Sequence, residues 1–130
     1  MKQKLAHISI VIDNYDKAIK YYTEVLKFTL IEDTKLSETK RWVLVTPTGG
    51  AGCNLLLAQA KNELEKSRIG NQTGGRVFLF LHTDDFDRDY KNLLKHNVKL
   101  IRQPVVEEWG KVLVFEDIYG NLWDLIEPIG

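Results

Sequence analysis

Residues 7–16 of the chain read HISIVIDNYD and residues 78–87 read FLFLHTDDFD, so that an apolar run leads each time into acidic residues around one aromatic. The two stretches lie 71 positions apart, and sliding one onto the other places His7 on Phe78. In both, the apolar run is typical of a β-strand, and the acidic residues behind it are typical of the start of a helix. Two copies of so long a unit favour a fused pair of half-domains over a solenoid, so we predict a duplicated module.

Each copy continues with the same predicted elements. The predicted strands are 5–12, 28–31, 42–45 and 54–58 in the first copy, and 77–82, 98–101, 112–115 and 122–126 in the second. A helix follows the first strand of each copy, with apolar stripes at Ala18, Tyr21, Tyr22, Val25 and Leu26 and at Phe86, Tyr90, Leu93 and Leu94. We therefore predict an α+β fold of two βαβββ modules in tandem, at about 5–59 and 76–128, joined by a Gly-rich linker at 60–75 within a single domain of residues 1–130.

The composition argues against two classes of partner. With 18 basic and 18 acidic side chains, the chain has no excess of positive charge for nucleic acid or for anionic lipid. The apolar stretch near the N-terminus contains His7 and Ser9 and stops at Asp13, which is too short for a secretion signal or a membrane span. Cys53 is the only cysteine, so no internal disulfide can form. We expect a cytoplasmic protein with neither nucleic acid nor membrane as its partner.

Several segments of the chain carry motifs of a known superfamily. These motifs are the pair Trp109-Gly110 and the closing segment DIYGNLWDLIEP at 117–128, together with the opening strand that contains His7. In these features the chain resembles the vicinal oxygen chelate superfamily, which includes glyoxalase I, extradiol dioxygenases, fosfomycin-resistance thiol transferases and bleomycin-binding proteins. Two positions depart from the pattern, because Lys27 stands where a glycine usually ends the first helix and Ile118 stands where a proline is usual.

The resemblance implies mixed sheets curled around a central cavity, with a divalent metal held by up to four residues on the inner face. Two of those positions match His7 and Asp124, which could ligate a metal, whereas the other two fall on Leu56 and Phe78. Catalytic zinc usually has three protein ligands, and open iron sites have two histidines and a carboxylate. One histidine and one aspartate are fewer than either set requires, so we expect no cofactor, with a weakly held divalent metal as the alternative.

Three interpretations of His7 and Asp124 remain open from the sequence. The two side chains could form a hydrogen-bonded polar pair without a metal. They could hold a metal that is completed by water, by Asn54 or Ser9, or by oxygens of a substrate. They could also form a catalytic pair, with His7 as general base and Asp124 fixing its tautomer.

Aromatic side chains indicate the kind of ligand. Strand alternation predicts that His7 and Ser9 share the concave face of their module and that Phe78 and Phe80 share that of the second. Trp109 is predicted in a loop, where a large aromatic side chain is hard to explain by packing alone.

The residues that we predict to line the ligand site are Ser9, Asn54, Leu56, Phe78, Phe80 and Trp109. We predict a homodimeric small-molecule-binding protein with a degenerate metal site, whose ligand is at least partly aromatic or apolar. The alternative is a metal-dependent lyase, isomerase or thiol transferase of the glyoxalase or antibiotic-modifying type.

Overall fold

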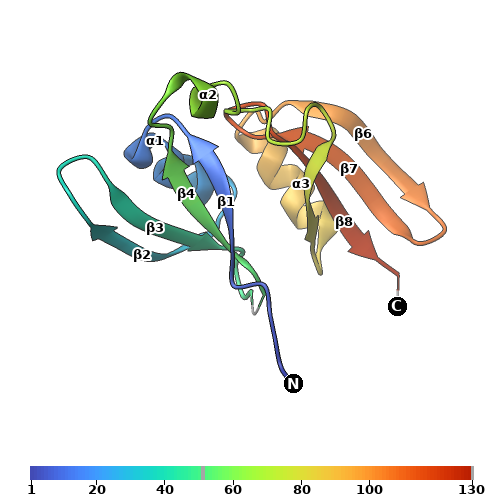
Figure 1. The fold of residues 1–130 in the computed structure, drawn as a ribbon. Helices are drawn as coiled ribbons and strands as arrows, with labels where there is room; N and C mark the ends of the chain where they lie inside the picture. The colour runs from blue at the N-terminus through green and yellow to red at the C-terminus, as the bar shows by residue number, and fades with distance from the viewer. Residues whose placement is uncertain (51, 130) are drawn as a thin grey trace. The chain divides into compact units, whose positions relative to one another are not determined.

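The computed structural model describes residues 1–50 and 52–129, and these divide into two compact units, Met1–Ile69 and Gly70–Gly130. Each unit contains one four-stranded mixed sheet with its own helix (Figure 1). The predicted α+β fold of two tandem βαβββ modules is confirmed. The sheets are open and do not close into barrels.

In the first unit a strand is followed by a helix and then by three more strands. Its elements are β1 (His7–Ile12), α1 (Tyr15–Lys20), the π-helical turn η1 (Tyr21–Val25), β2 (Thr29–Lys35), β3 (Arg41–Thr46), β4 (Asn54–Gln59) and the short helix α2 (Glu63–Lys66). The strand order is β1-β4-β3-β2, with β1 parallel to β4 and the other pairs antiparallel.

The second unit repeats this topology. Its elements are β5 (Val77–His82), α3 (Phe86–Lys95), β6 (Leu100–Glu107), β7 (Gly110–Glu116) and β8 (Leu122–Pro128). The order β5-β8-β7-β6, with β5 parallel to β8, matches that of the first sheet strand for strand. The duplication that the two quoted stretches predicted is therefore present in the strand connectivity.

Both long helices begin where the acidic pattern predicted. The side chain of Asn14 accepts a hydrogen bond from the backbone N–H of Lys17 at 2.9 Å, and Asp85 accepts one from that of Arg88 at 3.1 Å. These caps satisfy backbone donors that the first helical turn leaves without a partner. The first helix then widens into η1, where the N–H of Leu26 donates to the carbonyl of Tyr21 at 3.2 Å, and this widening was not predicted.

Two edge strands are longer than predicted. Strand β2 continues to Lys35, beyond the predicted end at residue 31, because residues 32–35 pair with β3 as far as Arg41. Strand β6 continues to Glu107 across register shifts on both sides of Arg102, and it includes Pro104. A proline fits an edge strand, whose outer side donates no ladder hydrogen bond.

The apolar core of each unit lies between its sheet and its helix. In the first unit Ile10, Ile12 and Tyr22 are fully buried, as strand alternation and the helical stripe predicted. In the second unit the rings of Phe115 and Trp123 stack with their centroids 5.9 Å apart. These contacts fix which face of each sheet is turned away from its helix, and that opposite face carries the candidate site.

The closing motif of the sequence forms a buried turn between β7 and β8. The carboxylate of Asp117 accepts hydrogen bonds from the backbone N–H groups of Tyr119 and Asn121 and from the side-chain amide of Asn121, at 2.9, 3.0 and 2.9 Å. Gly70 packs against this turn so closely that a Cβ atom there would lie 2.0 Å from the carbonyl oxygen of Tyr119. This motif therefore has a structural role, which explains why it marks the fold so clearly.

Candidate functional site

Four of the predicted site residues share one face of the first sheet. Residue pairs in register point to the same side, and the register pairs His7 with Asn54 and Ser9 with Leu56. The neighbouring pair Ile10 and Leu57 is completely buried on the opposite face. His7 and Ser9 thus lie on the face away from the first helix, as predicted.

The imidazole of His7 has two neighbours on this face. Its Nδ1 lies 3.3 Å from the side-chain amide nitrogen of Asn54, and its ring meets that of Trp42 edge to face, with centroids 6.1 Å apart and planes at 77°. An amide nitrogen can only donate, so Nδ1 accepts this hydrogen bond and the ring proton of the neutral form is on Nε2. His7 therefore presents an N–H donor on this face.

Asp124 occupies the position in the second sheet that Leu56 occupies in the first. It pairs with Phe80, just as Leu56 pairs with Ser9, so the two modules place these four residues equivalently. Phe80 is 64% exposed, an unusual value for a phenylalanine in a strand. Partial burial raises the pKa of Asp124, and the positive charge of Arg102 lowers it by a smaller amount.

The strand register does not determine on which face of the second sheet Phe78 and Trp109 lie. The register of β5 against β8 shifts between Val77 and Leu79, so the pairing does not fix the face of Phe78, which is half-buried. Trp109 is 52% exposed in the turn between β6 and β7, as predicted for a loop residue. Its neighbour must be glycine, because a Cβ atom at Gly110 would lie 2.4 Å from the carbonyl oxygen of Glu127.

The side chains at the four implied metal positions do not fit a metal centre. Leu56 and Phe78 have no atom that can ligate a metal, and Nδ1 of His7 lies 3.3 Å from the side-chain amide nitrogen of Asn54. Glu127 does not replace them, because its carboxylate accepts a hydrogen bond at 2.8 Å from the backbone N–H of Phe86 at the start of α3. Among residues 1–50 and 52–129, no group of three or more His, Cys, Asp or Glu side chains could hold a metal ion.

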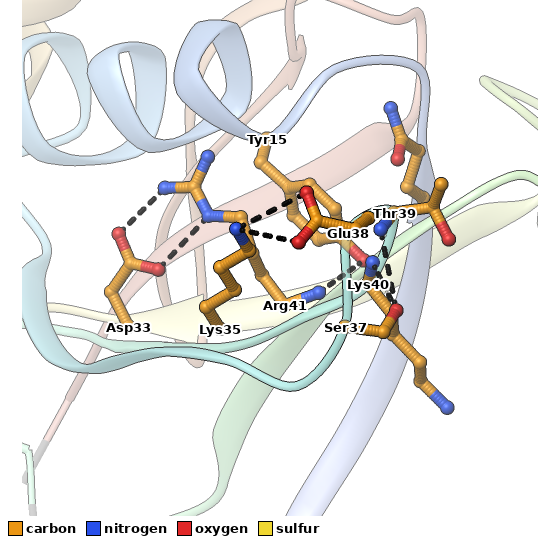
Figure 2. Close-up of a pocket in the computed structure, with 9 residues that line it drawn as sticks. Tyr15, Asp33, Lys35, Ser37, Glu38, Thr39, Lys40 and Arg41 are labelled. Atoms are coloured by element: carbon orange, nitrogen blue, oxygen red, sulfur yellow. Dashed lines mark hydrogen bonds and ion pairs between the residues drawn. The ribbon is translucent and has the colours of Figure 1, made fainter.

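A pocket that the sequence did not predict opens on the helix-covered side of the first sheet, with a volume of about 480 Å³ (Figure 2). Arg41 lies in its wall and donates to both carboxylate oxygens of Asp33, at 3.0 and 2.6 Å, and to Asp16 at 2.9 Å. The guanidinium also lies 5.2 Å from the ring centroid of Tyr15.

Arg41 and Lys35 in this pocket already form ion pairs with neighbouring carboxylates, so a charged ligand would have to compete with these pairs. The hydrogen bonds from Arg41 to Asp33 and Asp16 raise the pKa of its guanidinium above the ordinary value. Lys35 is likewise paired with Glu38 at 3.4 Å (Figure 2). The sequence did not predict the contact between Arg41 and Asp16, because it joins the start of the first helix to a hairpin 25 residues away.

Comparison with known proteins settles the family. The family model of the Glyoxalase/Bleomycin resistance protein/Dioxygenase superfamily matches residues 4–125. The chain belongs to this superfamily. The vicinal oxygen chelate resemblance inferred from His7, Trp109-Gly110 and the closing segment is thereby confirmed.

Relatives of the chain span its full length. An uncharacterized protein of Shewanella frigidimarina (strain NCIMB 400) is 53% identical over 128 residues, covering 98% of this chain and 95% of its own. Among solved structures, UcmS2 has a TM-score of 0.83 at 26% identity, covering 98% of this chain and 99% of its own. TnmS3, an antibiotic-binding protein from Streptomyces sp. CB03234, has a TM-score of 0.77 at 27% identity, covering 98% of each chain.

Proposed function

We propose that the protein binds a small, at least partly aromatic or apolar molecule without a metal ion and without transforming it. The observation that carries this proposal is Phe80, whose ring is 64% exposed on the face opposite to the core of its sheet and lies beside Asp124. Removing such a ring from water on ligand binding contributes about 25 cal/mol per Å² of apolar surface. Small-molecule sites are lined mainly by apolar and aromatic side chains with a few polar groups, and Phe80 and Asp124 supply one of each kind.

The other predicted site residues agree with this function. Leu56 and Phe78 place hydrocarbon where the superfamily can place metal ligands, which favours apolar contact over coordination. His7 and Asn54 supply polar groups that could orient the ligand. In the second unit the half-exposed Trp109 adds a further aromatic side chain that a ligand could contact.

The known relatives support the same proposal at the level of the family. TnmS3, which resembles this chain over nearly its whole length, is an antibiotic-binding protein, so a hydrophobic antibiotic is a reasonable ligand class to test first. No helix in the described part of the chain is long and apolar enough to cross a membrane. We further propose that the protein acts in the cytoplasm and that it forms a homodimer. A measurement of its molar mass in dilute solution would test the homodimer.

The function can be tested by truncating the exposed ring. A panel of hydrophobic antibiotics and aromatic compounds is screened by thermal shift, and binding of the best compound is then measured by calorimetry for the wild type and Phe80→Ala. We expect a loss of about tenfold in affinity, as for an aromatic side chain at the centre of an interface. Leu94→Ala is the matched control, because Leu94 is 50% exposed on α3 and lies away from this face.

The outcome separates binding from catalysis. Equal affinity of wild type and Phe80→Ala would contradict the proposed site. Stabilisation by ligands that appears only after addition of Mn²⁺, Ni²⁺ or Zn²⁺ would instead favour a metal-dependent lyase, isomerase or thiol transferase of this superfamily.

A further inference from the structure

Four residues form a single row across the second sheet. The register pairs Arg102 with Val114, Val114 with Asp124, and Asp124 with Phe80, so these side chains share one face on four adjacent strands. Adjacent strands lie about 4.8 Å apart, so the carboxylate of Asp124 and the exposed ring of Phe80 are immediate neighbours. A ligand that covers the ring of Phe80 therefore also meets Asp124.

The charged groups around Asp124 are paired with one another, but Asp124 is not. Glu107 accepts a hydrogen bond from Arg102 at 3.1 Å, and Glu116 lies 3.8 Å from the ammonium group of Lys99. Within residues 70–129 the carboxylate of Asp124 forms no hydrogen bond or ion pair, although it is partly buried and feels the charge of Arg102 through space. A partly buried carboxylate without a donor loses hydration and gains no partner in return.

Phe80 and Asp124 favour the same kind of chemical group. The face of an aromatic ring attracts a cation, and a carboxylate accepts strong hydrogen bonds from a protonated amine. An anionic ligand would instead approach the negative charge of Asp124, which no hydrogen bond or ion pair within residues 70–129 neutralises, and a neutral apolar ligand would leave this carboxylate dehydrated. We infer that the ligand of this site is a cationic amine joined to an aromatic or apolar body, and that Asp124 selects for its charge.

This inference rests on the proposed function, and matched probes separate the two. The probes are 2-naphthylmethylamine, which is protonated at neutral pH, and 2-naphthylmethanol, which has the same ring and is neutral. Binding of both is measured by calorimetry in the presence of EDTA. We expect the wild type to bind the amine at least about tenfold more tightly than the alcohol, because the charged hydrogen bond forms only with the amine.

Two variants test whether Asp124 causes the preference for the amine over the alcohol. Asp124→Asn should abolish the preference for the amine while leaving affinity for the alcohol within about twofold, because the amide keeps the shape and loses the charge. Asp87→Asn, which removes the same charge from the exposed first turn of α3, should keep the preference.

The possible results distinguish a failure of this inference from a failure of the proposed function. Equal binding of the two probes by the wild type, or a preference that survives in Asp124→Asn, would overturn the inference and leave the proposed function standing. Failure of both probes to bind folded wild-type protein would contradict the inference and count against the proposed function as well.

Discussion

The side-chain amide nitrogen of Asn54 lies 3.3 Å from Nδ1 of His7, its partner across the parallel pair of β1 and β4. Because the amide nitrogen can only donate, this contact selects the imidazole tautomer with the proton on Nε2. In that tautomer Nε2 can donate a hydrogen bond. It has no free lone pair with which to bind a metal. The polar end of the first sheet is therefore suited to an acceptor atom of a ligand.

The tautomer of His7 is our first prediction. Long-range ¹H–¹⁵N NMR at alkaline pH, where the ring is neutral, should show the proton on Nε2. Asn54→Asp should move it to Nδ1, since a carboxylate accepts where the amide donates. Ser9→Ala, on the same face, should change nothing. Finding the proton on Nδ1 in the wild type would contradict the hydrogen-bond direction described for Asn54.

The second prediction concerns Lys27, which has a φ of 64° directly after the first helix. A left-handed conformation strains any residue with a Cβ atom, and glycine is the usual residue at such helix ends. Lys27→Gly should therefore raise the free energy of unfolding by about 0.5–1 kcal/mol, measured by urea denaturation.

Asn97 provides the matched control for Lys27. It ends α3 with a φ of 57°, and asparagine tolerates this conformation better than lysine does. Asn97→Gly should change the stability by only about 0.3 kcal/mol. A destabilised Lys27→Gly would show that the lysine side chain makes a contact worth more than the backbone strain.

The third prediction tests the structural role of Asp117. This carboxylate is 4% exposed and accepts three hydrogen bonds in the turn before β8. Asp117→Ala leaves those buried donors without a partner and should cost about 3 kcal/mol of stability. Glu108→Ala, in the exposed turn after β6, should stay within about 0.5 kcal/mol of the wild type. Similar stabilities of the two variants would remove the structural explanation of the closing motif.

The fourth prediction follows from the raised pKa of Asp124, which burial shifts upward from its ordinary value of 3.8. An acid whose pKa is higher in the folded state binds protons more tightly there, so its ionised form destabilises the fold as the pH rises through that range. Asp124→Asn should therefore be more stable than the wild type at pH 7. The difference should vanish in acid, where the aspartate is protonated in both states. Urea denaturation across pH 3–8 measures it, and a destabilised Asp124→Asn at pH 7 would contradict the burial described for this carboxylate.

The sequence was sufficient for the fold and for the face of the first sheet on which His7 and Ser9 lie. The repeat that aligns His7 with Phe78 required two equivalent modules, and the register confirms it, because Ser9 faces Leu56 as Phe80 faces Asp124. Strand alternation correctly placed Ser9 opposite the buried face that contains Ile10. Such features depend on local periodicity, which a single sequence shows directly.

The features that the sequence missed depend on contacts between distant segments. The predicted strand ended at residue 31, yet β2 continues to Lys35, and Asp33 binds Arg41 across the hairpin. The widening of the first helix at Tyr21 has no propensity signal, and the register shift beside Phe78 is visible only from the pairing with β8. The pocket walled by Arg41 was missed for the same reason.

The most direct test of the account is whether ligand binding needs a metal. Purified protein is treated with EDTA and dialysed, and binding of the best ligand from the thermal-shift panel is measured by calorimetry with and without an equivalent of Zn²⁺, Ni²⁺ or Mn²⁺. Because Leu56 and Phe78 have no donor atoms, we predict the same affinity in all samples and no bound metal in the untreated protein. Binding that disappears with EDTA and returns with one metal equivalent would contradict the account.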